Sequence, residues 1–425
     1  MQISTKAMGC ALLAGLSLAA CSTAPADSGG PAPTSTASGA ISGTLTILYV
    51  KMFQPALEPV VKAFEQKYPG TKVDVNYVSG DVGNLIGTQL QAGTAADIFV
   101  TLPGSGGVMN VHTLAAQGKL LDLSDSPWVS GIPRLWQSDM AFNGKTYAYP
   151  GTLQGLGAIY NMTKLKELGL KPPKTWSEVL GLCKSAKDHG LYAYAQGLND
   201  SAGPQMMFLA LSADLVYGPT PDFSTQLKEK KTTVPASPWR QVLDKYKQMN
   251  DAGCFGEGVM GRTRTQGSDE VAAGKALGIV DVGAAIAPIE KAAPKSELTI
   301  LPMPATDDPA GTYFPALPGF TVSANAQAKN PAAAKAFLNM LAEPENISVY
   351  AKGYASVPLI PVPGFKPPAN LAALNEAIAA GKSAKIADWP NPKVNDVAQQ
   401  GVQAILLGKD TIDEVLQKMQ EAFEG

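Results

Sequence analysis

The stretch "TLTILYVKMFQPALEPVVKAFEQKYPGTKVDVNYV" (44–78) changes its hydrophobic periodicity twice. Residues 44–50 are rich in β-branched and aromatic side chains, which favours a strand. The next segment, 55–70, has helical spacing and ends at a Pro-Gly pair, where a helix stops. Its larger apolar side chains share one helical face: Leu57, Val60, Val61, Phe64 and Tyr68. In residues 72–78 apolar and polar side chains alternate, as in a second strand.

The alternation of strands and helices continues along the chain. A second helical stretch leads to a third strand, "ADIFV" (96–100), so that strand, helix, strand, helix and strand follow one another. This order is typical of parallel βαβ units. Later strands are expected at 145–150, 157–161, 276–282, 297–301 and 319–324, and later helices at 174–190 and 410–423. The sequence therefore predicts an α/β fold.

The N-terminus carries an export signal. Residues 7–20 are almost all apolar or small and follow Lys6, but fourteen residues are too few to cross a bilayer core of roughly 30 Å. A charged start, a short apolar run and small residues before a cleavage point indicate a secretory signal peptide over 1–20. The run ends in Leu-Ala-Ala-Cys, which resembles the lipobox of bacterial lipoproteins and implies that Cys21 is lipidated. The alternative is an ordinary secreted protein with a stray cysteine.

A tether follows the predicted anchor. Residues 22–40 contain only Ser, Thr, Ala, Pro, Gly and one Asp. Such a segment has no large apolar side chain whose burial could offset its ordering entropy, so we expect 21–43 to be a disordered tether. A flexible coil of this length reaches roughly 24 Å on average. The folded body would stay near a membrane surface without entering it.

Length and composition limit the possible domain number and function of the folded part of the chain after the tether. The chain has 425 residues, of which 45% are hydrophobic and 16% charged, with a formal net charge of −2. About 380 residues after the tether suit two lobes better than one core. No basic stripe is present, so no nucleic-acid partner is expected. The two histidines, His112 and His189, are far apart in sequence, which disfavours a Ser-His-Asp or a His-based metal site. No cofactor or metal is predicted.

Two cysteines remain in the body, Cys183 and Cys254. Export to an oxidising compartment favours a disulfide between them. Closing the interval of 71 residues would stabilise the fold by about 4 kcal/mol in the chain-entropy model. Two buried thiols are the alternative, because Cys183 falls on the apolar face of the helix expected at 174–190.

Four segments resemble a known family. They occur in chain order: "AGTAADIF" (92–99), "KTYAYPGTLQGLGAIYNMTKLKELGLKPPKTWSEVL" (145–180), "GFTVSANAQAKNPAAAKAFLNMLAEPEN" (319–346) and "ILLGKDTIDEVLQKMQEAF" (405–423). Together they look like the extracellular solute-binding proteins of ABC importers, in the family that includes maltose-binding protein. The most specific piece is Tyr160-Asn161 shortly before "PPKTW" (172–176).

The resemblance implies a two-lobed α/β fold of the periplasmic-binding-protein type (type II), with hinge-linked lobes that close over a central ligand cleft. The first lobe would take 44–150 and 284–345, and the second 151–283 and 346–425. The chain would cross between lobes in "YPGTLQGLG" (149–157). The implied protein is a monomer held outside the cell membrane by its lipid anchor, and it delivers a carbohydrate to an ABC permease.

Candidate ligand residues come from two arguments. Ligands bind beyond the carboxyl ends of parallel strands, which points to Phe53, to Ser105 within "TLPGSGG" (101–107) and to Asp281. The family resemblance adds five more positions: Asp97, Gln154, Gly319, Phe320 and Trp389. Each has a plain structural alternative: a packed aromatic for Phe53 and Phe320, a satisfied hinge polar group for Gln154, and a structural acid for Asp97. We expect Trp389 to be the aromatic platform for a sugar ring.

The chain departs from sugar-binding members in one respect. Those members often carry an aromatic residue in the segment that here reads Gly283-Ala284-Ala285, and "TLPGSGG" also has none. The glycine-rich loop could instead present backbone amides to an anion, or it could be a tight turn. The alternatives to a sugar receptor are thus a receptor for a polyol, a sugar phosphate or another anionic solute, a secreted glycosidase with paired carboxylates, and a structural or adhesive lipoprotein.

Overall fold

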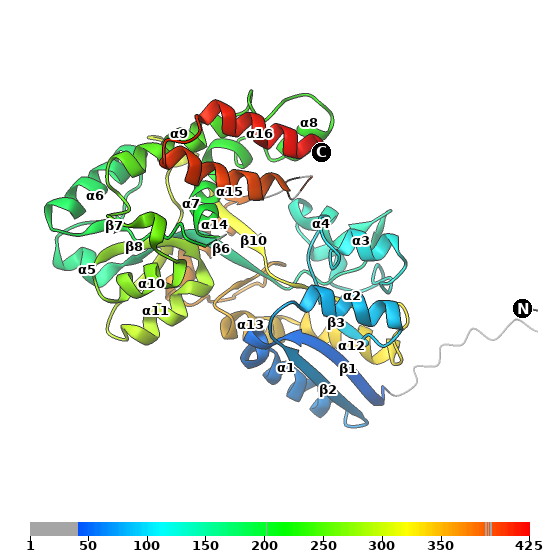
Figure 1. The fold of residues 1–425 in the computed structure, drawn as a ribbon. Helices are drawn as coiled ribbons and strands as arrows, with labels where there is room; N and C mark the ends of the chain where they lie inside the picture. Colours follow the sequence, from blue (N-terminus) through cyan, green and yellow to red (C-terminus); the bar gives the residue numbers. More distant parts are fainter. Residues whose placement is uncertain (1–40, 201, 387–388, 390, 392) are drawn as a thin grey trace, which may run out of the picture. The chain divides into compact units, whose positions relative to one another are not determined.

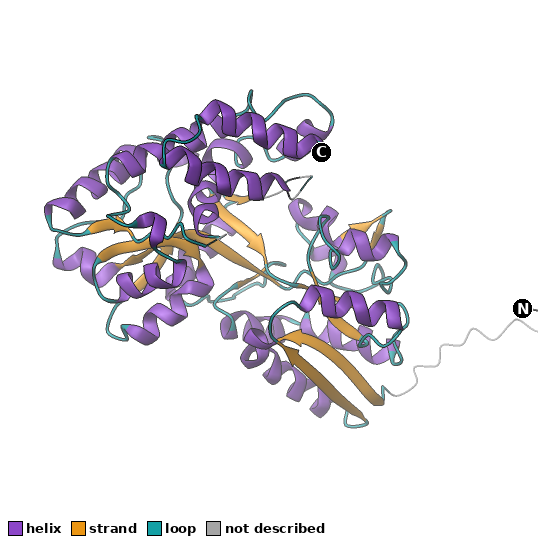
Figure 2. Ribbon diagram, viewed as in Figure 1, coloured by secondary structure: helices purple, strands orange, loops and turns teal. Residues whose placement is uncertain are grey.

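The computed structural model describes residues 41–425 apart from 201, 387, 388, 390 and 392 (Figure 1). The predicted signal peptide, Cys21 and nearly all of the tether therefore lie outside the described residues. Residues 41–425 form one compact unit with two main sheets and helices on their faces (Figure 2).

The first sheet has the strand order β11-β3-β1-β2. Its strands are β1 (Gly43–Val50), β2 (Thr71–Val78), β3 (Ile98–Thr101) and β11 (Thr321–Ala324). β1 pairs in parallel with β2 and with β3, whereas β11 is antiparallel to β3. The parallel βαβ arrangement predicted for residues 44–100 is therefore confirmed.

Helices and a small hairpin complete the part of the chain around this sheet. The helices are α1 (Gln54–Lys67), α2 (Val82–Ala92), α3 (Val111–Ala116), α4 (Arg134–Met140), α12 (Pro331–Leu341) and α13 (Pro344–Gly353), and the hairpin is β4 (Ala141–Phe142) with β5 (Lys145–Thr146). Three of the five apolar residues predicted on one face of α1 are fully buried: Leu57, Val60 and Phe64. The helical periodicity of 55–70 thus marks the face that covers the sheet.

The second sheet has the strand order β13-β10-β6-β8-β7, and β9 and β12 also pair with β6. Its strands are β6 (Thr152–Asn161), β7 (Tyr192–Tyr194), β8 (Ala276–Val282), β9 (Leu298–Leu301), β10 (Phe314–Pro318), β12 (Val357–Pro358) and β13 (Ser383–Lys385). Successive β6 residues enter different apolar clusters, Ala158 and Tyr160 one cluster and Ile159 the other. Both faces of the sheet are therefore covered.

The helices around the second sheet include the predicted helix at 174–190 and the predicted terminal helix. They are α5 (Met162–Glu167), α6 (Trp176–Asp188), α7 (Gly203–Ser212), α8 (Phe223–Lys228), α9 (Trp239–Asp251), α10 (Arg264–Ala272), α11 (Ile286–Ala292), α14 (Ala372–Ala379), α15 (Lys393–Leu406) and α16 (Ile412–Glu424). The capping box predicted at Thr411 and Glu414 is present at the start of α16.

Two predicted lobe boundaries are wrong. The chain was expected to enter the first lobe at 284, but β9 and β10 pair with β6 in the second sheet, and the first sheet is reached only at β11. It was expected to leave the first lobe at 346, but α13 stays with it, because the Tyr350 hydroxyl lies 2.7 Å from the hydroxyl of Tyr49 on β1. We therefore call residues 43–149 and 321–353 the first lobe, and 152–318 and 357–425 the second lobe.

Within the described part of the chain, three short crossovers join the lobes: residues 150–151, residues 319–320 and residues 354–356. Gly151 has a φ of 63°, and a Cβ at this position would lie 3.4 Å from the carbonyl oxygen of Phe320. The Gly319 amide donates to the Thr152 carbonyl at 2.9 Å. The first two crossovers are therefore in direct contact.

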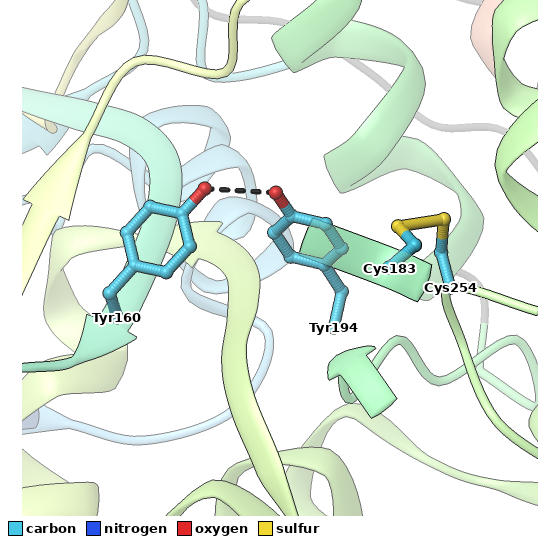
Figure 3. Close-up of a disulfide and its surroundings, with 4 residues drawn as sticks. All are labelled: Tyr160, Cys183, Tyr194 and Cys254. Carbon is cyan, nitrogen blue, oxygen red and sulfur yellow. Dashed lines mark hydrogen bonds between the residues drawn. A yellow bond between two sulfur atoms is a disulfide. The ribbon is translucent and has the colours of Figure 1, made fainter. Parts of the chain in front are cut away.

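A disulfide joins Cys183 on α6 to Cys254 in the turn that follows α9, with 4.7 Å between the two Cα atoms (Figure 3). Both cysteines are fully buried. Beside them the hydroxyls of Tyr160 and Tyr194 lie 2.9 Å apart. Both tyrosines pair with Gly278 of the intervening strand, and a side chain at Gly278 would approach the Tyr160 ring to 3.2 Å. The disulfide and the tyrosine pair thus fix the outer part of the second sheet.

Candidate ligand-binding site

The carboxyl edge of the first sheet carries an exposed apolar surface. β1 ends before Met52, and β3 ends before Leu102 and Val108. These three side chains are 56%, 36% and 56% exposed. Only two other large apolar side chains are exposed among the residues that the structure describes, namely Val349 and Leu407. Because the strands are parallel, their carboxyl ends lie along one edge, where ligands bind in open α/β sheets.

Two backbone amides of the glycine-rich loop after β3 donate hydrogen bonds to acceptors within the protein. The Gly104 amide donates to the Asp139 carbonyl at 2.9 Å, and the Gly107 amide donates to Asn110 Oδ1 at 2.8 Å. Ser105 is exposed, and its hydroxyl lies 2.7 Å from His112 Nδ1. Its loop therefore has the geometry of a supported turn rather than of an open set of amides for an anion.

The carboxyl edge of the second sheet holds a cavity. β7 and β8 are parallel, so the loops that follow them meet at one edge. A cavity of about 420 Å³ opens there. Its lining is Asp200, Ala202, Arg264, Thr265, Ser268, Asp281, Ala285 and Pro288. A larger cavity of about 690 Å³ lies between the 170–174 loop and α6, away from this edge, and we do not assign the site to it.

An ion pair forms one wall of the second-lobe cavity. Arg264 Nε donates to Asp281 Oδ2 at 3.0 Å, and Arg264 Nη2 donates to Asp281 Oδ1. Asp281 is only 2% exposed and also accepts a hydrogen bond from the Val282 amide at 2.7 Å. Burial opposes the charge of Arg264, but the hydrogen bond and the attraction to Asp281 raise the pKa of the guanidinium. The ion pair therefore holds both groups in fixed positions.

Asp200 lines the same cavity. Its Oδ2 accepts from the Arg264 amide at 2.7 Å, and its Oδ1 accepts from the Gly203 amide at 2.7 Å. The carboxylate thus ties the start of α10 to the start of α7. Each oxygen keeps further acceptor capacity, because a carboxylate oxygen has two lone pairs.

The predicted crossover residues do come together. Gln154 Nε2, near the start of β6, donates to the Tyr354 hydroxyl at 2.9 Å, which links β6 to the third crossover. Phe53 packs on Tyr354 with ring centroids 4.0 Å apart and on Phe320 with centroids 5.6 Å apart. A Cβ at Gly319 would lie 3.9 Å from Gln154 Nε2. Phe53 is only 2% exposed, so its ring packs within the protein, whereas Gln154, Gly319 and Phe320 stay partly exposed.

Asp97 has a structural position. Its carboxylate accepts hydrogen bonds from the Thr46 amide and hydroxyl and from the amides of Lys329 and Asn330. Burial alone would raise the pKa of Asp97, but these hydrogen bonds lower it below the ordinary value of an aspartate. Asp97 thus joins β1, the start of β3 and the start of α12, and it lies at the amino end of β3 rather than at the carboxyl edge.

The expectation that Trp389 offers a ring face in a polar loop is wrong. Trp389 is 8% exposed and belongs to the apolar core of the second lobe. Its ring centroid lies 5.0 Å from that of Trp239 and 6.1 Å from that of Phe223. Neighbouring aromatic rings thus occupy the surface that a sugar would need.

An ion pair connects the two lobes directly. Lys385 on β13 donates to Asp139 Oδ1 on α4 at 2.8 Å, and its ammonium lies 5.9 Å from the centre of the Trp136 ring. Both side chains of the pair are largely buried. Asp139 also supports the glycine-rich loop through its carbonyl, so this contact borders the first-lobe edge.

Sequence reasoning missed Asp200 and Arg264. β7 is only three residues long, too short for its sequence to indicate a strand, so the expectation that ligands bind after parallel strands did not extend to the loop that follows it. The available signals were the "LNDSAG" segment before α7 and the Thr263 capping box that starts α10. Asp281 was found because β8 has a clear apolar pattern.

Two α/β lobes, three crossovers and candidate binding surfaces at the carboxyl edges define a two-lobed binding protein. Residues 52–347 match the family model described as bacterial extracellular solute-binding protein, and the chain belongs to this family. The predicted family and fold class are thereby confirmed. Among the described residues, none of the helices is both long enough and apolar enough to traverse a membrane.

Several relatives are sugar-binding proteins by name. The chain is 28% identical over 137 residues to the multiple sugar-binding protein of Streptococcus mutans, covering 32% of each chain. It is 30% identical over 195 residues to the maltooligosaccharide ABC transporter solute-binding lipoprotein of Streptococcus pneumoniae, covering 45% of this chain and 41% of the relative. The matches thus span about a third to two-fifths of the length of these relatives.

Solved structures share the fold over a longer stretch. The apo form of RafE from Streptococcus pneumoniae has a TM-score of 0.76 and 22% sequence identity, and the match covers 90% of this chain and 99% of RafE. RafE in complex with raffinose has a TM-score of 0.73 and 20% identity, with 90% and 100% covered. At this identity the likeness establishes the fold.

Proposed function

We propose that this protein is the substrate-binding component of an ABC importer, which captures a neutral carbohydrate between its lobes and delivers it to a membrane permease. The observation that carries the proposal is the contrast between the two carboxyl edges. The first-lobe edge exposes Met52, Leu102 and Val108, and the second-lobe edge holds a charged, hydroxyl-lined cavity. A sugar has both an apolar ring face and a hydroxylated rim, and binding sites pair apolar walls with a few placed polar groups.

The names of similar proteins support the carbohydrate class. Relatives are named for multiple sugars and for maltooligosaccharides, and a fold neighbour was solved with raffinose. Another neighbour, a sugar transporter protein from Bacillus licheniformis with a TM-score of 0.65, was solved with stachyose. These ligands are neutral oligosaccharides.

The charges favour a neutral ligand over an anionic one. The second-lobe cavity contains two aspartates and one arginine, and the arginine is already paired with Asp281. The glycine-rich loop of the first lobe has two of its amides occupied by protein acceptors. A phosphate or carboxylate group would lie near the Asp200 carboxylate, and Arg264, the one cation among the described lining residues, is already engaged by Asp281.

We infer that the protein binds rather than cleaves its ligand. His112 lies between the Ser105 hydroxyl and the Ser138 carbonyl, and His189 Nδ1 lies 2.8 Å from the Ser185 carbonyl. Through these contacts His112 supports the glycine-rich loop, and His189 caps the end of α6. Turnover of any neutral oligosaccharide by the purified protein would favour the glycosidase alternative instead.

A thermal-shift screen tests the proposed ligand class. We expect raffinose, stachyose or maltotriose to raise the melting temperature, because a ligand present at a hundredfold excess over its Kd stabilises the folded state by about 2.7 kcal/mol. Glucose 6-phosphate and galacturonate serve as charged counterparts of similar ring size. Stabilisation by a charged compound alone would replace the neutral sugar with an anionic solute, and no response to any carbohydrate would contradict the proposal.

We further propose that the protein is anchored outside the cell membrane through acylated Cys21, which lies outside the described residues. We expect Cys21→Ala to abolish incorporation of labelled fatty acid and to release the protein from membranes, because the Leu-Ala-Ala-Cys segment would no longer supply a thiol. Cys10→Ala is the matched control and should keep the label. A Cys21→Ala protein that remains labelled would contradict the anchor.

A further inference from the structure

The cavity of the second lobe contains a preorganised donor that no described protein group uses. The Arg264 side chain donates through Nε and Nη2, in both cases to the Asp281 carboxylate. Among the described residues, none accepts a hydrogen bond from Nη1. The buried Asp281 carboxylate binds two nitrogens of the Arg264 guanidinium, so the plane of this group is fixed before a ligand arrives. This reduces the conformational entropy lost on binding.

Acceptors line the same cavity as this donor. Asp200 is held by two backbone amides and retains lone pairs, and Ser268 and Thr265 add hydroxyls that can donate or accept. A pair of neighbouring sugar hydroxyls needs this combination, since each hydroxyl both donates and accepts a hydrogen bond. An anion that carries no hydroxyl could accept a hydrogen bond from Arg264 but could not donate one to Asp200.

Small residues leave the space that a ring requires. Ala202, Ala285 and Pro288 form the rest of the lining, and the cavity of about 420 Å³ lies within the range of roughly 300–1,000 Å³ typical of ligand sites. Ala285 belongs to the segment in which the family resemblance leads one to expect an aromatic platform. A large side chain at this position would extend into the cavity that Ala285 now lines.

We propose that Arg264, positioned by Asp281 and aided by Asp200, is the specificity-determining group of the second lobe, and that it recognises two adjacent hydroxyls of one neutral sugar ring. This inference rests on the proposed function and refines it. The second lobe thus selects its ligand by the hydroxyl pattern of the ring, whereas the exposed apolar residues of the first lobe contact a ring face. Asp281 acts as a positioning residue, since its carboxylate is engaged by Arg264 and by the Val282 amide.

Calorimetric titration of three proteins tests the assignment. The probe is whichever of raffinose, stachyose and maltotriose gives the largest thermal shift with the unaltered protein. We expect Arg264→Met to weaken its binding by at least about 30-fold, the loss typical of a binding hot spot. Methionine keeps much of the apolar stem and removes every donor. Arg240→Met is the matched control, because Arg240 forms an exposed ion pair with Asp413 in the same lobe. This variant should bind the probe with unchanged affinity.

A second readout separates recognition from support of the fold. Analogues of the probe that lack one ring hydroxyl should bind the unaltered protein more weakly than the probe does. The analogue that lacks the hydroxyl contacted by Arg264 should, in contrast, bind Arg264→Met as well as the probe binds this variant. A merely structural arginine would lower the affinity for all analogues by the same factor. Ala285→Trp provides a variant that leaves Arg264 in place, and we expect it to weaken binding by filling the cavity.

The outcomes are distinguishable. Normal affinity in both Arg264→Met and Ala285→Trp would overturn the assignment and leave the proposed function intact. An equal loss for the probe and for every deoxygenated analogue would also overturn it. If none of the three neutral sugars binds the unaltered protein, the proposed function itself fails, and the inference fails with it.

Discussion

Trp389→Ala is expected to lower the free energy of unfolding by about 3–5 kcal/mol, the cost of truncating a large buried aromatic side chain. The ring is 8% exposed and packs against Trp239 and Phe223 within the core of the second lobe. Its removal would leave a cavity between α8, α9 and the segment before α15. Any loss of ligand affinity should follow from this loss of stability rather than from a lost contact.

Equilibrium unfolding of purified Trp389→Ala in guanidinium chloride measures this loss of unfolding free energy. Trp389→Phe is the control, since it keeps an aromatic ring in the site and should cost markedly less. If Trp389→Ala unfolds at the same denaturant concentration as the unaltered protein but no longer binds sugar, the ring belongs to the ligand site after all.

Removing the disulfide with the double substitution Cys183→Ala, Cys254→Ala should cost about 4 kcal/mol, because the bond closes an interval of 71 residues and restricts the unfolded chain. Both cysteines are fully buried, and alanine introduces no polar group into the apolar core around them. The substitution therefore mainly removes the cross-link and two sulfur atoms.

Thermal unfolding with and without dithiothreitol provides the measurement. The reductant should lower the melting temperature of the unaltered protein toward that of the double variant and should leave the double variant unchanged. Identical melting of the unaltered protein in both conditions, with two titratable thiols after denaturation, would contradict the cross-link.

The sequence allowed correct prediction of features that depend on short-range patterns. The change of periodicity within 44–78 correctly predicted β1, α1 and β2, because alternation and helical spacing reflect which face of each element is buried. Thr411 and Glu414 marked the start of α16 through their mutual hydrogen bonds. Asp281 was placed at a strand end because β8 is almost entirely apolar.

The pairing of strands that are distant in sequence could not be predicted, because the local pattern does not indicate which remote segment a strand will join. β10 and β11 are separated by only two residues, Gly319 and Phe320, yet β10 pairs with β6 and β11 pairs with β3. Nothing in the local pattern indicates that the chain changes sheets between them. For the same reason the lobe boundary expected at 284 was wrong.

Burial by distant side chains also escaped prediction. Trp389 has polar neighbours along the chain, but Trp239, about 150 residues earlier, packs against its ring. Arg264 acquires its role from Asp281 on another element and from the Asp200 carboxylate after a strand of three residues. Such constellations depend on tertiary contacts that periodicity does not encode.

The most direct test of ligand capture by both lobes is backbone hydrogen exchange, followed by mass spectrometry, with and without a saturating concentration of the neutral oligosaccharide that gives the largest thermal shift. We predict slower exchange in two places at once, the 102–109 loop of the first lobe and the 264–268 and 283–285 segments of the second lobe. Protection confined to one lobe, or centred on the 170–185 region instead, would contradict the account.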